Sequence, residues 1–308
     1  MFICRMIKQQ ITELKKLKNA VILAHYYTLP EVQDIADFVG DSLALSKQAA
    51  ETNADIILFA GVHFMAETAK ILSPQKKVLI PDMQAGCSLA DSCDAKQLET
   101  FLQSYPQHTV LSYINCSAEV KALSDIIVTS GNALKVVNAL PKNEKIVFAP
   151  DRNLGAYINK ETGREMVLWN GSCHVHDQLT TDEVFKLKEK YPNAKVLAHP
   201  ECKAPVLALA DFIGSTAAML NFTKNERTLE FIVATETGIL YQMQKQNPEK
   251  RFYVVNNPET CACNDCEYMK RNTLEKIYQT LLTESPEIVL EEELIKKALT
   301  PIQRMLEF

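Results

Sequence analysis

The 308-residue sequence lacks the signatures of several large functional classes. No uninterrupted apolar run approaches the roughly 20 residues that a membrane-spanning helix needs. The chain has only 9 glycines, and neither a GxGxxG nor a GxxxxGK[ST] phosphate loop occurs in it. Its formal net charge is −5, and no basic stripe with interleaved aromatic residues is present. These absences argue against a membrane protein, a nucleotide-dependent enzyme and a nucleic-acid-binding protein.

A secretory signal peptide is also lacking. Residues 1–18 carry basic side chains but have no apolar central region and no small-residue cleavage site, so we expect an amphipathic helix there. A cytoplasmic location is therefore expected. In a reducing compartment, the 9 cysteines of this chain indicate metal binding or catalysis rather than disulfides.

The sequence repeats a pattern of four apolar segments three times, with a period near 86 residues. The first segments read VILAHYY, VLSYIN and VLAHPE, and the last read VLIPD, MVLWN and FYVVN. Uninterrupted apolar runs are typical of parallel strands buried on both faces, and the amphipathic stretches between them favour helical crossovers. Chance similarity between strand–helix units is the alternative. The recurrence of matching side chains favours an α/β fold with a pseudo-threefold triplication of a small three-layer α/β/α domain, each with a parallel four-stranded sheet.

The repeat predicts where the domains begin and end. We expect domains at residues 1–86, 87–172 and 173–267, with helices of residues 268–308 packing on the first. In open parallel sheets, ligands bind beyond the carboxyl ends of the strands. If the three domains turn these ends inward, their strand-end residues share one active site at the central axis.

One cysteine follows the last strand of each repeat. These are Cys87, Cys173 and Cys266. Soft thiolates spread over three domains favour an iron–sulfur cluster over a structural zinc site. Cys263 and Cys266 also form a C-x-x-C pair, which is common in zinc and iron–sulfur sites, but no further Cys or His follows it. The alternative is that these cysteines are small buried hydrophobic residues.

Polar side chains follow the first strands of the repeats. His25 and His199 occupy equivalent strand ends, and His176 lies close after the second repeat's cysteine. Glu201 lies on the same side of an extended segment as His199, where a carboxylate suits iron ligation or base catalysis. The counterparts in the first two repeats are Tyr27, Tyr113 and Asn115. A single histidine at a strand end is more often a structural hydrogen-bonding group, but three around one predicted cavity favour function.

Hydroxyl side chains follow the second strands at Ser42, Ser130, Ser215 and Thr216. Near helix N-termini, hydroxyls and free backbone N–H groups form binding sites for phosphate or carboxylate. As isolated residues they are helix N-caps, and both interpretations can hold together. Because the chain is net negative, anionic ligands have to be held by such local donors.

Motifs along almost the whole chain resemble the quinolinate synthase family. They are HxY at 25–27, DMxAGCSLAD at 82–91, YxNxSAEVKA at 113–122, GxCxxH at 171–176, HPE at 199–201, GST at 214–216 and CxxCxYMK at 263–270. The resemblance implies a trilobed α/β/α fold and a [4Fe–4S] cluster held by Cys87, Cys173 and Cys266. It implies that iminoaspartate and dihydroxyacetone phosphate condense to quinolinate, with loss of phosphate and water, in de novo NAD synthesis. A functional link to L-aspartate oxidase or aspartate dehydrogenase is also expected.

The resemblance further implies residue roles, with the cluster as a Lewis acid for dehydration. The expected catalytic residues are Tyr27, His199, Glu201, His25 and His176. The expected substrate-binding residues are His25, Ser42, Tyr113, Asn115, Ser130, His199, Glu201, Ser215 and Thr216. Two positions depart from the family pattern, since Glu267 replaces the usual proline after Cys266 and Cys116 replaces the usual threonine. A regulatory disulfide between Cys261 and Cys263 is left open.

Two other functions are consistent with parts of this pattern. One is a different iron–sulfur hydro-lyase on the same scaffold. The other is a non-catalytic iron–sulfur protein, such as an electron carrier. A carrier normally has four cysteine ligands and no acid–base cluster, so the His, Tyr and Glu residues weigh against it.

Overall fold

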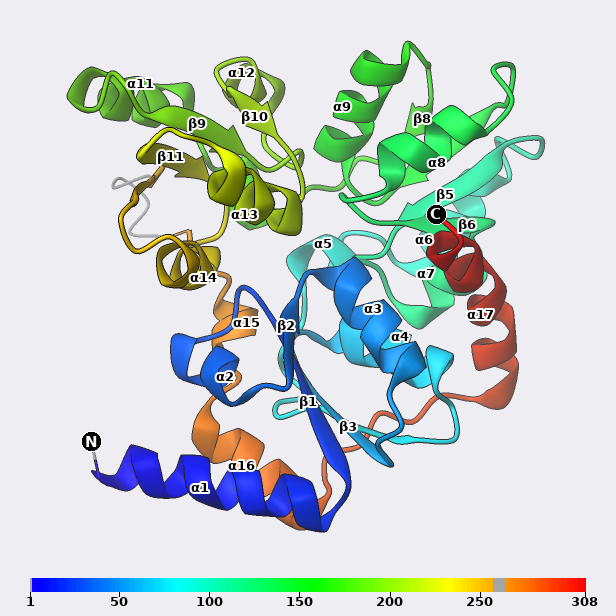
Figure 1. Ribbon diagram of the computed structural model, residues 1–308. Helices are drawn as coiled ribbons and strands as arrows, with labels where there is room; N and C mark the ends of the chain where they lie inside the picture. Colours follow the sequence, from blue (N-terminus) through cyan, green and yellow to red (C-terminus); the bar gives the residue numbers. More distant parts are fainter. Residues whose placement is uncertain (1, 257–263) are drawn as a thin grey trace.

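The computed structural model describes residues 2–256 and 264–308 and shows three α/β units in chain order (Figure 1). The first unit follows helix α1 (Phe2–Leu17) and contains β1 (Ala20–His25), α2 (Pro30–Ile35), β2 (Phe38–Gly40), α3 (Ser42–Glu51), β3 (Ile56–Ala60), α4 (His63–Leu72) and β4 (Lys77–Leu79). The second contains α5 (Ser88–Asp91), α6 (Ala95–Leu102), β5 (Thr109–Tyr113), α7 (Ala118–Ala122), β6 (Ile126–Val128), α8 (Ala133–Ala139), β7 (Ile146–Ala149), α9 (Arg152–Thr162) and β8 (Val167–Leu168).

The third unit contains α10 (His174–Asp177), α11 (Thr181–Lys190), β9 (Lys195–Ala198), α12 (Ala204–Leu207), β10 (Phe212–Ile213), α13 (Thr216–Asn225), β11 (Glu230–Ala234), α14 (Ile239–Gln246) and β12 (Arg251–Val254). The chain ends with α15 (Glu267–Lys270), α16 (Leu274–Thr283) and α17 (Glu292–Leu306). No helix in the described ranges is both long and apolar enough to cross a membrane.

The three sheets share one topology. Their strand orders are β2-β1-β3-β4, β6-β5-β7-β8 and β10-β9-β11-β12, and all pairs are parallel. The predicted fold class, a triplicated α/β/α domain with parallel four-stranded sheets, is confirmed. In each sheet the winding reverses between the first and third strands of the unit. Ligand crevices in such sheets lie outside the carboxyl ends of the two strands that flank this reversal.

The central strands are buried on both faces, as their uninterrupted apolar sequences predict. In β1, Leu23 packs in a core with Leu45 of α3. The neighbouring Ile22 points to the opposite face, where it packs with Ile11 of α1 and Ile277 of α16. Burial of each such side chain stabilises the fold by about 1.5–3 kcal/mol. Helical layers on both faces therefore fix the direction in which each strand end points.

The last two long helices pack on different parts of the molecule. Helix α16 contacts α1, whereas α17 contacts α7 and β6 of the second unit and α4 of the first (Figure 1). The apolar face of α17, with Ile295, Ala298 and Ile302, belongs to a core that continues through the first two units. This helix therefore joins two units rigidly. The domain boundaries expected at residues 86, 172 and 267 stay a prediction.

Candidate active site and metal centre

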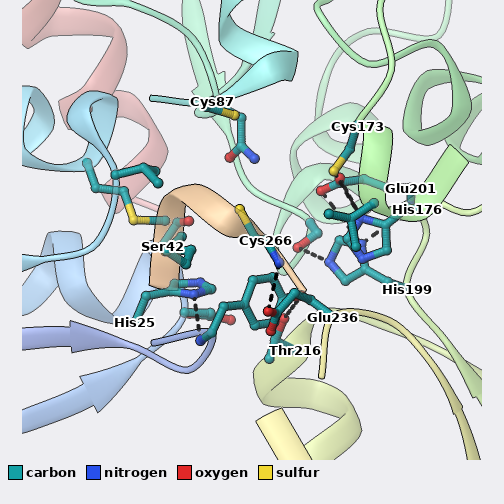
Figure 2. A pocket seen from close by; sticks show the side chains of 18 of the residues that line it. His25, Ser42, Cys87, Cys173, His176, His199, Glu201, Thr216, Glu236 and Cys266 are labelled. Carbon is teal, nitrogen blue, oxygen red and sulfur yellow. Dashed lines mark hydrogen bonds and ion pairs between the residues drawn. The ribbon is translucent and has the colours of Figure 1, made fainter. Parts of the chain in front are cut away.

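A cavity that is partly open to solvent is lined by residues from all three units. Its walls come mainly from the carboxyl ends of the strands. Figure 2 shows side chains from the different units around it. The sequence-predicted residues that line it are His25, Tyr27, Ser42, Cys87, Tyr113, Asn115, Ser130, Cys173, His176, His199, Glu201, Thr216 and Cys266. The fold thus gathers into one place residues that are far apart in the sequence.

Ser215 is the one predicted site residue that is not in the cavity wall. It is the N-cap of α13 and accepts a hydrogen bond from the backbone N–H of Ala218. Strand register explains the difference, because His25 pairs with Gly40 and Tyr113 pairs with Val128, each two residues before the serine. In the third unit Ala198, the residue before His199, pairs with Ile213. Counting on from this pair in the same way places Thr216, and not Ser215, at the position equivalent to the two serines. A substrate role for Ser215 stays a prediction.

The three cysteines occupy the same structural position. Each is the N-cap of a single-turn helix: Cys87 of α5, Cys173 of α10 and Cys266 of α15. Backbone N–H groups at the start of these helices act to lower the pKa of the sulfur atoms, namely those of Leu89, Ala90, His176, Tyr268 and Met269. Donors of this kind stabilise a thiolate. The repeat in the sequence is therefore also a repeat in local geometry.

The donor set of these cysteines fits a soft metal group. Burial raises the pKa of Cys87 to about 12 and that of Cys266 to about 11. The pKa of Cys173 is also raised, first by burial and then by the charges of Glu201 and Cys87. Thiols with such raised pKa values ionise readily only when a cation replaces their protons. Cys261 and Cys263, including the question of a disulfide between them, lie outside the described residues.

Two buried carboxylates hold the backbone of two of these cysteines. Asp151 Oδ2 accepts the N–H of Cys173 at 3.2 Å, and Glu236 Oε1 accepts the N–H of Cys266 at 3.0 Å. Both acids lie two residues beyond the third strand of their unit, and Val62 holds that position in the first. The sequence prediction did not include these acids, because the predicted site residues follow other strands of each unit. The signal for them is an acid two residues after the third strand, in Ala-Pro-Asp at 149–151 and in Ala-Thr-Glu at 234–236.

Lys270 links the third unit to the first. Its Nζ forms an ion pair with Glu236 at 2.8 Å and donates to the backbone oxygen of Tyr27 at 2.7 Å. Gly238 also lies close to the backbone of Tyr27, and only glycine fits there because a Cβ would lie 2.6 Å from the Cα of Tyr27. The loop that carries Tyr27 is thereby held against the cysteine loop of the third unit.

His25 and His199 are neutral donors at equivalent strand ends. In each ring Nδ1 accepts a backbone N–H two residues on, from Tyr27 at 3.2 Å and from Glu201 at 3.4 Å. The proton of the neutral imidazole is therefore on Nε2. Burial lowers the pKa of both histidines to about 3. The Nε2 of His199 lies 3.2 Å from Ser130 Oγ and donates to it.

Two side chains of the cavity bond to the carboxylate of Glu201. Tyr113 Oη donates to its Oε1 at 2.5 Å, and His176 Nδ1 lies 3.0 Å from its Oε2. Burial opposes ionisation, but electrostatic interactions with His176 and His199 and these hydrogen bonds lower the pKa of Glu201 to about 2. An ionised carboxylate in a buried site can accept a proton from a ligand.

A hydrogen-bond chain connects Glu201 to Tyr27. The hydroxyl of Thr235 lies 2.9 Å from His176 Nε2 and 3.0 Å from Tyr27 Oη, which also contacts Thr216 at 2.8 Å. Burial raises the pKa of Tyr27 well above its usual value, so its hydroxyl is protonated and can donate. Thr235 was not predicted from the sequence, because its position after the third strand of the unit had not been considered.

One further group is left to receive a ligand. The Oδ1 atom of Asn115 is buried and has no hydrogen-bond partner among the described residues. Buried polar atoms are normally paired, and Asn115 is in the cavity wall. With the hydroxyls of Ser42 and Ser130, it gives the cavity neutral polar contacts suited to an oxygen-rich ligand.

Known proteins match almost the whole chain. A family model described as quinolinate synthetase A protein matches residues 9–307. A quinolinate synthase of Microcystis aeruginosa is 59% identical over 297 residues, which cover 96% of this chain and 93% of the relative. Those of Synechocystis sp. and Thermosynechococcus vestitus are 58% and 59% identical, with the same coverage. The resemblance found in the motifs is confirmed, and this chain belongs to the quinolinate synthase family of enzymes.

Proposed function

We propose that this chain condenses iminoaspartate with dihydroxyacetone phosphate to form quinolinate, releasing phosphate and water, as a step of NAD synthesis. The observation that carries the proposal is the convergence of three cysteines, one from each repeat, on a cavity that also holds Glu201 and Tyr27. Family membership supports the same reaction.

Cys87, Cys173 and Cys266 would hold a [4Fe–4S] cluster. When bound, the cluster supplies a Lewis-acidic iron that has no protein ligand. The three N-capped turns fix the cysteine backbones, and Asp151 and Glu236 fix two of them further. Three protein thiols in a cavity with neighbouring acid–base groups favour a catalytic over an electron-carrying cluster.

Neutral donors position the substrates. The Nε2–H group of His25 serves as a donor to a substrate oxygen, and His199 polarises the hydroxyl of Ser130 toward the cavity. Ser42, Ser130 and Thr216 provide hydroxyls at equivalent places in the three units. One of these places holds the phosphate and the others hold carboxylates. Neutral donors release phosphate more readily than a dense arginine cluster does, which suits a reaction that expels it.

Glu201 and Tyr27 move protons in opposite directions. Glu201 is ionised and takes a proton from the substrate, whereas Tyr27 is protonated and gives one to a leaving oxygen. The chain through Thr235 and His176 returns the proton from Glu201 to Tyr27. Positioned acids and bases of this kind contribute roughly 10²–10⁴-fold to a rate.

The direct test is product formation by the full chain after anaerobic reconstitution with iron and sulfide. Quinolinate should form when iminoaspartate and dihydroxyacetone phosphate are both supplied, and phosphate should appear in equal amount. Iminoaspartate has to come from oxidation of aspartate, so L-aspartate oxidase or aspartate dehydrogenase serves as its source in the assay. If the reconstituted protein carries a cluster but forms no quinolinate, while dehydrating a simpler hydroxy acid, the hydro-lyase alternative is supported instead.

A further inference from the structure

We propose that the cluster-free chain binds one divalent transition-metal ion at a second kind of site, formed by Cys173, His176 and Glu201. These residues offer one sulfur, one nitrogen and one oxygen ligand, all within 4.8 Å of one another. Figure 2 shows the three side chains converging at one end of the cavity. The site uses only one of the three cysteines assigned to the cluster.

Two of the three distances between the ligand atoms fit tetrahedral coordination, and the third is at most 4.8 Å. His176 Nδ1 lies 3.3 Å from Cys173 Sγ and 3.0 Å from Glu201 Oε2. Zinc bonds of about 2.0–2.3 Å to N, O and S ligands place neighbouring ligand atoms roughly 3.2–3.6 Å apart in a tetrahedron. An ion bound to His176 Nδ1 therefore reaches either of these two atoms with only small shifts of the side chains.

Outer contacts already orient two of the ligands. The second ring nitrogen of His176 lies 2.9 Å from Thr235 Oγ1, which can accept a hydrogen bond from this nitrogen when Nδ1 binds a metal. Tyr113 donates to Oε1 of Glu201 at 2.5 Å and leaves Oε2 facing His176. Metal-binding histidines and carboxylates usually have such partners, which fix the ring tautomer and direct the lone pairs.

The chemical character of the donors selects the ion. One thiolate, one imidazole and one carboxylate suit Zn²⁺, Co²⁺ or Fe²⁺ rather than Mg²⁺ or Ca²⁺, which prefer oxygen ligands. His176 and Glu201 are each 2% exposed, so bulk water does not compete strongly for the ion. Three protein ligands leave a fourth position open to the cavity, as in catalytic zinc sites.

Sharing of Cys173 makes this site and the cluster mutually exclusive. A bound Zn²⁺ ion occupies the Cys173 sulfur and so prevents cluster assembly until it is removed. This consequence rests on the proposed cluster site, whereas binding of the divalent ion does not. The two claims therefore fail separately.

The test is titration of the full-length, cluster-free protein with Co²⁺ under anaerobic, reducing conditions. One ion per chain should bind, with tetrahedral visible bands and a thiolate-to-cobalt band of single-thiolate intensity. Cys173→Ser, His176→Gln and Glu201→Gln should each weaken binding by more than roughly 100-fold. Thr235→Val, which removes only an outer contact, should weaken it by about 10–100-fold.

Cys87→Ser and Cys266→Ser are the matched controls, because they remove a cluster thiol but no ligand of the proposed site. Both should bind Co²⁺ as the parent chain does, and circular dichroism checks that every variant is folded. Equal loss of binding in Cys87→Ser, Cys173→Ser and Cys266→Ser, with a three-thiolate band in the parent, overturns the proposal. Undiminished binding by folded His176→Gln and Glu201→Gln overturns it as well. Pre-loading with Zn²⁺ should then slow cluster assembly in the parent chain.

Discussion

Glu236 accepts the backbone N–H of Cys266 at 3.0 Å from a fully buried position. The equivalent acid of the second unit, Asp151, accepts the N–H of Cys173. Burial raises the pKa of both acids, while the Lys270 ammonium opposes this at Glu236. Two of the three cysteine turns are thus fixed by an acid at the winding reversal of their own sheet. This arrangement predicts that the acids control how tightly metal is held.

Removal of Glu236 should loosen the cluster. We expect Glu236→Ala to release iron to a chelator about 10–100-fold faster than the parent chain under anaerobic conditions, the range typical of outer-contact changes. Glu236→Gln, which keeps an oxygen acceptor for Cys266, should show a smaller effect. Asp94→Ala is the control, since Asp94 caps α6 and is not part of the cavity wall. Equal release rates from the Glu236→Ala and Asp94→Ala proteins would count against this role.

Replacement of single cysteines should distinguish the cluster ligands from cysteines that do not bind the cluster. Ala at position 87, 173 or 266 should abolish the broad visible absorption of the reconstituted protein, because each cysteine supplies one of the three protein ligands. Cys93→Ala serves as the control, because Cys93 is buried in a separate apolar core. Retention of a full cluster by the Cys266→Ala protein would show that Cys261 or Cys263 is the true ligand.

Tyr27→Phe and Glu201→Gln should keep the cluster and lose turnover. Each removes a proton donor or acceptor, which usually costs roughly 10²–10⁴-fold in kcat. The measurement is the rate of quinolinate formation per cluster-containing chain. Tyr26→Phe is the matched control, because Tyr26 adjoins Tyr27 but is not part of the cavity wall. Turnover at the parent rate in both site variants would mean that the roles are assigned wrongly.

Acid should destabilise the cluster-free protein through its buried imidazoles. The pKa of His25 and His199 is about 3 in the folded protein against 6.5 in an unfolded chain, because burial disfavours the charged ring. Between these pH values the unfolded chain binds protons that the folded chain does not. The free energy of unfolding therefore decreases as the pH is lowered through this range, by at most ~1.4 kcal/mol per pH unit for each histidine.

Urea unfolding at pH 7, 6 and 5 measures this dependence. His25→Gln removes one of the two groups, so its unfolding free energy should fall less steeply with acidification than that of the parent chain. His63→Gln tests the opposite sign, because the hydrogen bond to Glu67 raises the pKa of His63, so its removal should make the unfolding free energy fall more steeply with acidification. An identical pH dependence in the parent and His25→Gln proteins would rule out a buried neutral ring at this position.

Much of the fold was predictable because apolar segments and their end residues recur in order. The strand ends marked by His25, Tyr113 and His199 do lie in one cavity, and so do the three cysteines. The structural equivalence of Ser42, Ser130 and Thr216 was not predicted, because residue identity alone aligns Ser215 with the other two serines. Only strand pairing reveals the register, and pairing partners are not visible in a single sequence.

The residues that support the site were harder to predict. Asp151, Thr235 and Glu236 act through contacts with segments far away in the chain, and the only local sign of them is the acid that recurs two residues after the third strand of two units. Their common position after the third strand of a unit becomes meaningful only once the winding reversal places that strand beside the first. The packing of α17 across two units likewise depends on tertiary contacts and not on its amphipathic sequence.

The most direct test of the central claim is an anaerobic determination of iron and acid-labile sulfide in the reconstituted parent chain and in the three single cysteine variants. One cluster held by three repeats predicts about four iron and four sulfide per chain in the parent, by the composition of such clusters. It predicts loss of this stoichiometry in every variant. Iron without sulfide in the parent, or a full complement in any one of the Cys87, Cys173 or Cys266 variants, would contradict the account.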